Sequence, residues 1–196
     1  MTIGCHDGSK EINMLEFALG IRRKIGYWLS GYRFRPSGGF HGPLADKGKV
    51  LLVADVTSEK ARDAVSGLKT ELKRICPKAQ LNIAGFYNKE KGVTYNFISD
   101  DKVKYFTEDS FSFFFQFKDE DVKSLLTSGY DMAIFFTGQD NIMLDYASSF
   151  VVADLRLGWT GSYLDKIGLL NFSIIRDSDL NVSGRNIIEN LKMIFK

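Results

Sequence analysis

The sequence predicts an α/β protein with a three-layer, Rossmann-like fold, in which helices cover both faces of a mainly parallel sheet. Short apolar runs, typical of strands buried on both sides, alternate with longer segments whose apolar residues recur at intervals of three and four. This alternation is typical of β-α-β units, whose right-handed crossovers favour a doubly wound sheet. A basic amphipathic helix is expected to precede the sheet.

The first strand of the predicted sheet is the fully apolar run Val50–Ala54, which ends in Asp55. A helix is expected next, because the apolar residues of segment 61–75 form one stripe and Pro77 then stops the helix. A second strand is predicted at Leu81–Tyr87. Two weaker strand signals follow it, at Thr94–Ile98 and Val103–Phe106.

The second half of the predicted domain continues the alternation. Strands are predicted at Tyr130–Phe136, Ala153–Gly158 and Leu170–Ile175. Helices are expected at Asp119–Leu126, Ile142–Val151 and Ser183–Phe195. Ahead of them lies the phenylalanine-rich segment 111–117, whose alternate side chains can fill a core, while Phe114 breaks the alternation and can cover a neighbouring surface.

The composition is that of a globular protein with one domain of ordinary size and an extension. Of the 196 residues, 44% are hydrophobic and 26% are charged, so a packed core is expected. Cys5 and Cys76 belong to no C-x-x-C pair, which argues against a zinc or redox site. The N-terminus lacks the pattern of a signal peptide, and no apolar run is long enough to span a membrane. A soluble cytoplasmic protein is therefore expected.

A segment rich in turn-forming residues, Pro36–Pro43, predicts a boundary between two parts of the chain. Residues 1–48 are expected to form a basic helical arm and linker, and residues 49–196 the Rossmann-like domain. Residues 20–49 contain seven Lys or Arg and one acidic residue, a balance of +6. Because the whole chain carries +2, the remaining residues carry −4.

The arm is a candidate surface for binding a partner. Its basic residues lie beside aromatic residues and are Arg22, Arg23, Lys24, Arg33 and Arg35. This mixture suits single-stranded RNA, a ribosome-associated complex or an anionic membrane surface. The alternative is that these residues form the solvated face of a helix whose apolar side packs on the sheet.

A second candidate site lies beyond the carboxyl ends of the strands, where ligands of an open α/β sheet bind at the reversal of strand order. If Val50–Ala54 and Tyr130–Phe136 are neighbours, the loops after them form this crevice, and each loop precedes a helix N-terminus that favours an anion. The candidate ligand-binding residues are Asp55, Thr57, Ser58, Thr137, Gly138, Asp140 and Asn141. The alternative is that these residues only cap helices and shape turns.

The sequence contains no motif that identifies a reaction. No G-x-G-x-x-G follows the first strand, and the two histidines, His6 and His41, both lie in the arm. No cluster has the spacing of metal ligands. We therefore predict no catalytic residues, no metal and no cofactor. The loop Gly158–Tyr163 holds two aromatic residues at a strand end and is expected either to contact a ligand or partner, or to cover the core.

Several marks in the body of the chain carry a resemblance to a known family. They are Ala54-Asp55, Gly85-Phe86, Tyr130-Asp131 and the segment Leu144 to Ala147. With these marks, residues 15 to 196 resemble an uncharacterised family of small proteins from Bacteroidetes, catalogued as a domain of unknown function. The resemblance implies a basic N-terminal helix followed by one Rossmann-like sheet, and it implies no catalytic residues.

The same segments resemble, more distantly, the N-terminal half of heptosyltransferase-type glycosyltransferases. The stretch Leu155–Trp159 is similar to an R-x-G-like segment of those enzymes. They bind the sugar nucleotide with a second Rossmann domain, for which 196 residues leave no room. The resemblance therefore implies the fold and not the transferase activity.

Two functions of different classes are expected from these observations. The first is a non-catalytic interaction module whose basic arm docks on a partner, such as RNA or a ribosome-associated complex. The second is a protein, or a degenerate glycosyltransferase-like enzyme, that binds a nucleotide or sugar nucleotide in the crevice. The sequence leaves the oligomeric state open.

Overall fold

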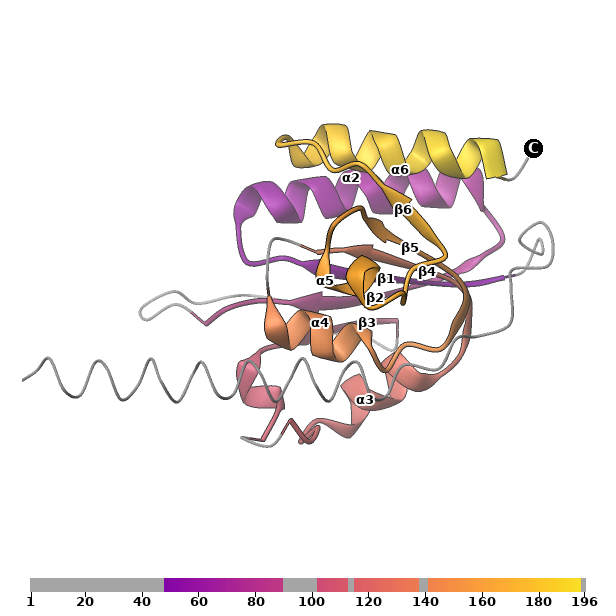
Figure 1. Ribbon diagram of the computed structural model, residues 1–196. Coiled ribbons are helices and arrows are strands. Elements are labelled where there is room, and N and C mark those ends of the chain that lie inside the picture. The colour runs from indigo at the N-terminus through magenta and orange to yellow at the C-terminus, as the bar shows by residue number, and fades with distance from the viewer. Residues whose placement is uncertain (1–47, 90–101, 113–114, 138–140, 195–196) are drawn as a thin grey trace, which may run out of the picture.

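The computed structural model describes residues 48–89, 102–112, 115–137 and 141–194 (Figure 1). The predicted basic arm lies outside these residues, as do the weak strand signal at 94–98 and two predicted site residues, Gly138 and Asp140.

The described chain forms one parallel sheet of six strands in the order β3-β2-β1-β4-β5-β6. The strands are β1 (Lys49–Asp55), β2 (Gln80–Phe86), β3 (Val103–Phe106), β4 (Tyr130–Phe136), β5 (Ala153–Trp159) and β6 (Phe172–Ile174). The chain builds outward from β1 to one edge, then returns and builds from β4 to the other edge. This is the strand order of a doubly wound Rossmann sheet, so the predicted fold class is confirmed.

Helices cover both faces of the sheet, as predicted. They are α2 (Glu59–Ile75), α3 (Glu120–Thr127), α4 (Ile142–Ser148), α5 (Tyr163–Lys166) and α6 (Leu180–Ile194), with a short 3-10 turn, η1 (Glu108–Ser110). Figure 1 shows α2 and α6 side by side above the sheet, and α3 and α4 below it. None of the helices in the described ranges is both long and apolar enough to cross a membrane.

The core consists of two layers, one on each face of the sheet. In β1, Val50, Leu52 and Ala54 belong to the layer under α2 and α6, whereas Leu51 and Val53 belong to the layer against α3, α4 and α5. All five side chains are at most 2% exposed. A strand covered on both faces has no position for a polar side chain, which explains the unbroken apolar run in the sequence.

The described phenylalanines of segment 111–117 pack in the core layer below the sheet, whereas Phe113 and Phe114 lie outside the described residues. Phe111 contacts Phe106, Phe117 and Tyr146 at ring-centroid distances of 6.1, 4.6 and 5.9 Å. Phe115 is fully buried and lies 5.0 Å from the Tyr146 ring. Its φ of 59° is unfavourable for a non-glycine residue, so burial of the ring offsets local backbone strain. These aromatic residues of 111–117 therefore serve the core.

Two helix boundaries differ from the predicted ones by three residues each. α4 ends at Ser148 and not at Val151, because the N–H groups of Phe150 and Val151 donate to carbonyls three residues back and tighten the chain into a turn. α6 begins at Leu180 and not at Ser183, because the Asp179 carboxylate accepts from the Asn181 N–H at 2.8 Å and starts the helix earlier.

Two isoleucines test this burial pattern with the same substitution. Ile134 in β4 is fully buried, so Ile134→Ala should lower the free energy of unfolding by about 2–5 kcal/mol through lost contacts and a cavity. Ile175, just after β6, is 78% exposed, so Ile175→Ala should change it by no more than about 0.5 kcal/mol. Chemical denaturation of both variants measures the difference, and equal losses would contradict the described core.

Candidate functional site

The predicted neighbour relation at the reversal point of the sheet is confirmed. β1 and β4 pair in parallel over five residue pairs, from Val50 with Met132 to Ala54 with Phe136. The chain leaves β1 toward β2 on one side and returns to β4 on the other, so strand order reverses between them. The loops after β1 and β4 therefore begin side by side, at the carboxyl edge where α/β sheets bind ligands.

The loop after β1 is held by its own hydrogen bonds. Asp55 Oδ1 accepts from the Thr57 N–H at 2.9 Å, and Ser58 Oγ caps α2 by accepting from the Ala61 N–H at 3.1 Å. Thr57 Oγ1 accepts from the Asn88 N–H at 3.1 Å, which ties this loop to the end of β2. Asp55, Thr57 and Ser58 therefore act at least as turn and cap residues. This is the role that the sequence analysis gave as the alternative to ligand binding.

The other two predicted site residues that the structure describes, Asn141 and Thr137, lie in the loop after β4 and have different roles. Asn141 caps α4, because its Oδ1 accepts from the N–H groups of Met143 and Leu144 at 3.2 Å each. Thr137 is buried, and its carbonyl accepts from the indole Nε1–H of Trp159 on β5 at 3.0 Å. Thr137 also lines a cavity that lies one strand further along the sheet, beside the end of β5.

This cavity, called the β4–β6 cavity below, lies beyond the carboxyl ends of β4, β5 and β6. Its volume is about 750 Å³, and its lining residues come from the β4 end, α4, the β5–α5 segment and the β6–α6 loop. They are Thr137, Asp145, Trp159, Thr160, Gly161, Ser162, Tyr163, Lys166, Arg176, Asp177 and Ser178. A volume of this size is typical of small-molecule sites.

The wall at the end of β5 is held by packing and hydrogen bonds. Trp159 is 3% exposed, and its ring packs edge-on against Phe136 at a centroid distance of 5.6 Å. Beyond it, Gly161 has a φ of +75°, a conformation that favours glycine, and its N–H donates to Asp165 Oδ2 at 2.8 Å. Ser162 Oγ accepts from the Asp165 N–H at 3.2 Å. The loop is therefore fixed by Asp165.

Two cations line the β4–β6 cavity, and neither pairs with a carboxylate in the part of the chain that the structure describes. Lys166 is exposed at the end of α5, and Arg176 is half-buried after β6. No carboxylate of the described residues lies within ion-pair distance of either one. Asp177 is engaged elsewhere, because its Oδ1 accepts from the Asp179 N–H at 2.8 Å and from the Ser178 hydroxyl at 3.3 Å. Both cations are therefore available to an anion.

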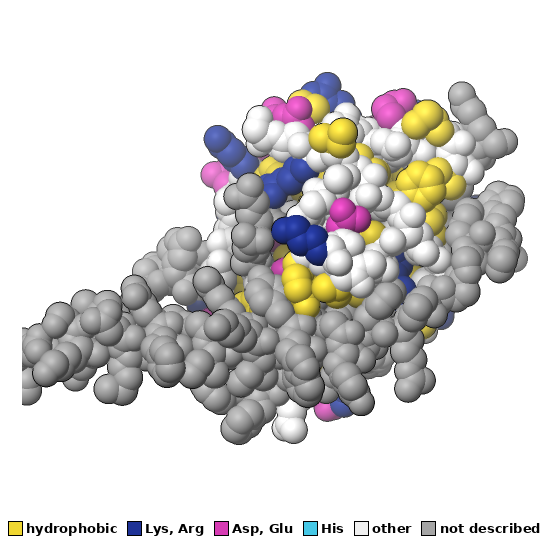
Figure 2. Space-filling view, in the orientation of Figure 1, with side chains coloured by type: hydrophobic (Ala, Val, Ile, Leu, Met, Phe, Trp, Pro, Cys, Tyr) yellow, Lys and Arg dark blue, Asp and Glu magenta, His cyan; other side chains and the backbone are white. Residues whose placement is uncertain are grey.

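Charged side chains are visible on the face of the molecule drawn in Figure 2. Several lysine and arginine side chains lie on its left part, the side toward which the strands run, interspersed with acidic side chains. Strand ends and cationic side chains thus lie on the same side of the domain.

A second hollow, of about 570 Å³, lies at the ends of β2 and β3, and its charges are largely paired. Lys89 lies 2.7 Å from Asp109, and this hydrogen bond and charge lower the pKa of Asp109 and raise the pKa of Lys89. Lys104 lies 3.1 Å from Asp121. These pairs lie at the surface, where ion pairs contribute little to stability.

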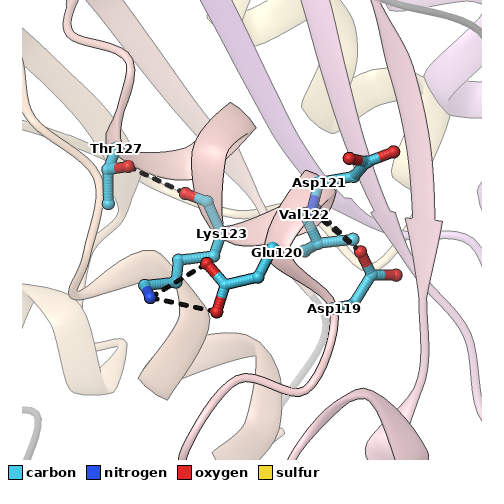
Figure 3. Close-up of polar contacts among 6 residues, drawn as sticks. All are labelled: Asp119, Glu120, Asp121, Val122, Lys123 and Thr127. Carbon is cyan, nitrogen blue, oxygen red and sulfur yellow. Dashed lines mark hydrogen bonds and ion pairs between the residues drawn. The ribbon is translucent and has the colours of Figure 1, made fainter.

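The acidic run beside this hollow has a structural role. Figure 3 shows Asp119 at the start of α3, where its carboxylate accepts from the N–H groups of Asp121 and Val122 at 3.1 Å each. Lys123 pairs with Glu120 at 3.0 Å. The run Asp119–Asp121 thus complements the helix dipole. Among the described residues, no group of three or more His, Cys, Asp or Glu is placed to hold a metal ion.

The sequence did not point to Asp145, Lys166 or Arg176 as site residues. They come from three separate segments that meet only in the folded sheet, and the four-residue helix α5 is too short to show a periodic pattern. One signal was present: the loop Gly158–Tyr163, singled out for its aromatic residues, lies at the cavity.

Comparison with known proteins identifies a family. Residues 44–192, which include every strand of the sheet, match the model of a family of unknown function (DUF6913). The chain belongs to this family. The family match starts at residue 44, shortly before β1, and so leaves out most of the arm. No curated protein and no solved structure gives a significant match. The match therefore confirms the predicted membership of a family of unknown function, and it assigns no activity to the chain.

Capping by Ser58 gives a test of the loop after β1. Ser58→Ala should lower the free energy of unfolding by about 1 kcal/mol because α2 loses its N-cap, whereas Ser58→Asp should retain most of the stability. Ser66→Ala, at an exposed position in the middle of the same helix, is the matched control and should cause no loss. A loss from Ser66→Ala equal to that from Ser58→Ala would show that the effect is not capping.

Proposed function

We propose that this protein is a non-catalytic binding module that holds a small anionic ligand in the β4–β6 cavity. One observation carries the proposal: Lys166 and Arg176 line the same cavity, and neither pairs with a carboxylate of the described residues. Small-ligand binding at the carboxyl edge is one of the two functions that the sequence predicts.

The surrounding groups favour an oxyanion. Arginine presents a planar fork of donors to phosphate or carboxylate, and lysine adds a mobile positive charge. The hydroxyls of Thr160, Ser162 and Ser178 add hydrogen-bonding groups around the same space. Because Trp159 and the Gly161 turn are already fixed, little conformational entropy is lost when a ligand binds there.

A binding role is favoured over a catalytic one by what lines the cavity. In the described part of the chain, no histidine lies beside the serine and threonine residues that line the cavity, because His6 and His41 both lie within residues 1–47. Serine catalysis needs such a base within hydrogen-bond reach.

Neutralising the cations tests the proposal. Inorganic phosphate serves as the probe, titrated into the full chain and followed by thermal shift, since a ligand that binds the folded state raises the melting temperature. Arg176→Gln and Lys166→Gln should each weaken binding about tenfold, because each removes a charge-assisted hydrogen bond. Arg185→Gln and Lys73→Gln, at exposed positions outside this cavity, should bind phosphate as the wild type does.

Two results would contradict the proposal. One is a wild-type protein that phosphate and other small oxyanions leave unshifted at millimolar concentration. The other is a shift that all four variants retain, because binding would then lie elsewhere on the surface.

We propose as a second candidate function that the basic arm docks on RNA or a ribosome-associated complex. The observation that favours it is the charge asymmetry of the sequence, with +6 in residues 20–49 and −4 in the remainder. The arm lies outside the described residues, so this function depends on the sequence alone.

Affinity purification of the tagged chain at two salt concentrations tests this second function. Contacts to phosphate backbones weaken steeply with salt, so co-purified RNA should fall as salt rises and should disappear when the five basic residues of the arm become Gln. The matched control replaces five cations of the body: Lys60, Lys69, Lys73, Lys118 and Arg185. RNA that co-purifies equally with both five-residue variants would contradict an arm-specific site.

Four expectations from the sequence remain predictions. They are an origin in Bacteroidetes, a cytoplasmic location, the likeness to heptosyltransferase-type enzymes, and a nucleotide or sugar nucleotide as the ligand. A phosphate-bearing ligand in the β4–β6 cavity would agree with the last of these.

A further inference from the structure

Strand β6 lies at one end of the strand order, so one side of it pairs with β5 and the other side faces no strand of the described residues. The Thr160 N–H donates to the Ile174 carbonyl at 3.0 Å, so Ile174 directs its backbone polar groups toward β5. These groups alternate in direction along a strand, so the N–H and C=O of Ser173 point to the open side. Ser173 is exposed, and the strand therefore presents a backbone donor and acceptor to solvent.

This edge of the sheet lacks the residues that usually protect an edge strand. Segment 167–175, which includes β6, contains no Lys, Arg, Asp, Glu or Pro. Proteins commonly place such residues at an edge because an unprotected edge pairs with another chain. The strand at the opposite end of the sheet, β3, contains Lys104 and directly follows Lys102. Charged residues are thus present at the β3 end of the sheet and absent at the β6 end.

The side of α6 that is turned away from α2 is also uncharged. The charged residues of this helix, Arg185, Glu189 and Lys192, all line the groove between α6 and α2. Because α2 follows the central strand β1 and α6 packs beside α2, the opposite side of α6 faces outward over the β6 end of the sheet. The residues on that side, spaced by three and four, are Val182, Asn186, Asn190 and Met193.

Large apolar side chains are exposed on the same elements. In the described part of the chain they are Val152, Phe172, Ile175 and Met193, with exposed fractions of 54%, 46%, 78% and 67%. Three of the four lie on β6, directly after it, or on α6. Figure 2 shows hydrophobic side chains at the surface in the upper part of the face it draws, where Figure 1 places α6 and β6.

We propose that β6 of one copy pairs antiparallel with β6 of a second copy, about a twofold axis at Ser173, and that the chain forms a homodimer with one continuous sheet. At this axis the Ser173 N–H of each copy donates to the Ser173 carbonyl of the other, so a single residue supplies both donor and acceptor. The two α6 helices then lie antiparallel on the same face of the sheet, with their uncharged sides toward each other. This dimer is independent of any ligand in the β4–β6 cavity.

A second copy fits this edge better than a partner of another kind. The edge strand is its own complement about a twofold axis, which is the commonest symmetry of soluble oligomers. An uncharged surface has no excess of one sign that would attract nucleic acid, an anionic membrane or an acidic peptide. Like charges would also meet across a twofold axis, so a surface that pairs with itself is favoured by their absence.

The exposed area suits a weak dimer. A standard interface buries roughly 800 Å² on each partner. At their exposed fractions, Phe172, Ile175 and Met193 each offer on the order of 100 Å², about a third of that area together. The backbone of β6 and the outer side of α6 can supply the remainder. Because β6 has three residues, we expect a dissociation constant in the micromolar range and a monomer in dilute solution.

The molar mass of the wild-type full chain tests the proposal, measured by light scattering or sedimentation over a range of protein concentrations. The mass should rise from that of one chain in dilute solution to that of two chains at roughly 100 μM. A mass of one chain throughout this range would overturn the proposal without any variant.

Substitution of Ser173 tests the backbone pairing. Ser173→Pro removes the outward N–H and should weaken dimerisation at least about tenfold, since two hydrogen bonds are lost in each dimer. The ladder to β5 does not use this N–H, so the variant should fold, which circular dichroism checks. Ser173→Ala keeps the backbone N–H and is the matched control, which should dimerise as the wild type does.

A second pair of variants tests the surface around the strand. Phe172→Glu places like charges close to the twofold axis and should also weaken dimerisation at least about tenfold. Val152→Glu changes an exposed apolar residue before β5, away from the pairing strand, and should leave the dimer intact. A dimer that persists unchanged in Phe172→Glu and in Ser173→Pro would lie on another surface, including residues 1–47, and would overturn the proposal. If Ser173→Pro does not fold, Phe172→Glu and the wild-type mass still decide.

Discussion

Strand β1 is covered on every side, by β2 and β4 along its edges and by helices on its two faces. Five consecutive side chains, from Val50 to Ala54, are at most 2% exposed, and each contacts one of the two core layers. The strand therefore needs partners from both halves of the chain, and its position fixes where strand order reverses. The proposed ligand contacts and the helix caps lie at the carboxyl edge of the sheet, and the position of β1 determines where strand order reverses along that edge.

Trp159 connects this core to the β4–β6 cavity. Its ring packs on Phe136 at the end of β4, and its indole N–H donates to the Thr137 carbonyl, so two neighbouring strand ends are held at a fixed spacing. The groups proposed to bind the ligand, Lys166 and Arg176, project from the elements that follow. A rigid floor with longer side chains at the rim is an arrangement that binds a ligand without large loop movement.

Most of the sheet could be predicted because its strands are continuous apolar runs with strong local signals, as in Val50–Ala54 and Tyr130–Phe136. The end of α4 could not be predicted, because the turn after Ser148 is formed by backbone hydrogen bonds that no particular residue type indicates. The crevice between β1 and β4 was located from topology alone, and its described side chains prove to be turn, cap and lining residues. The cavity escaped prediction because Asp145, Lys166 and Arg176 share no local pattern and meet only through the order of β4, β5 and β6.

The pairing of β1 with β4 has a consequence for synthesis of the chain on the ribosome. The Lys49 N–H donates to Asp131 Oδ2 at 2.6 Å, across 82 residues of sequence. While those residues are being made, β1 can pair with β2, and β2 with β3, but the other edge of β1 remains an uncovered row of backbone groups flanked by apolar side chains. Such an edge pairs readily with other chains. The nascent protein is therefore most exposed to aggregation between completion of β3 and emergence of β4, and only translation of residues 130–136 ends that interval.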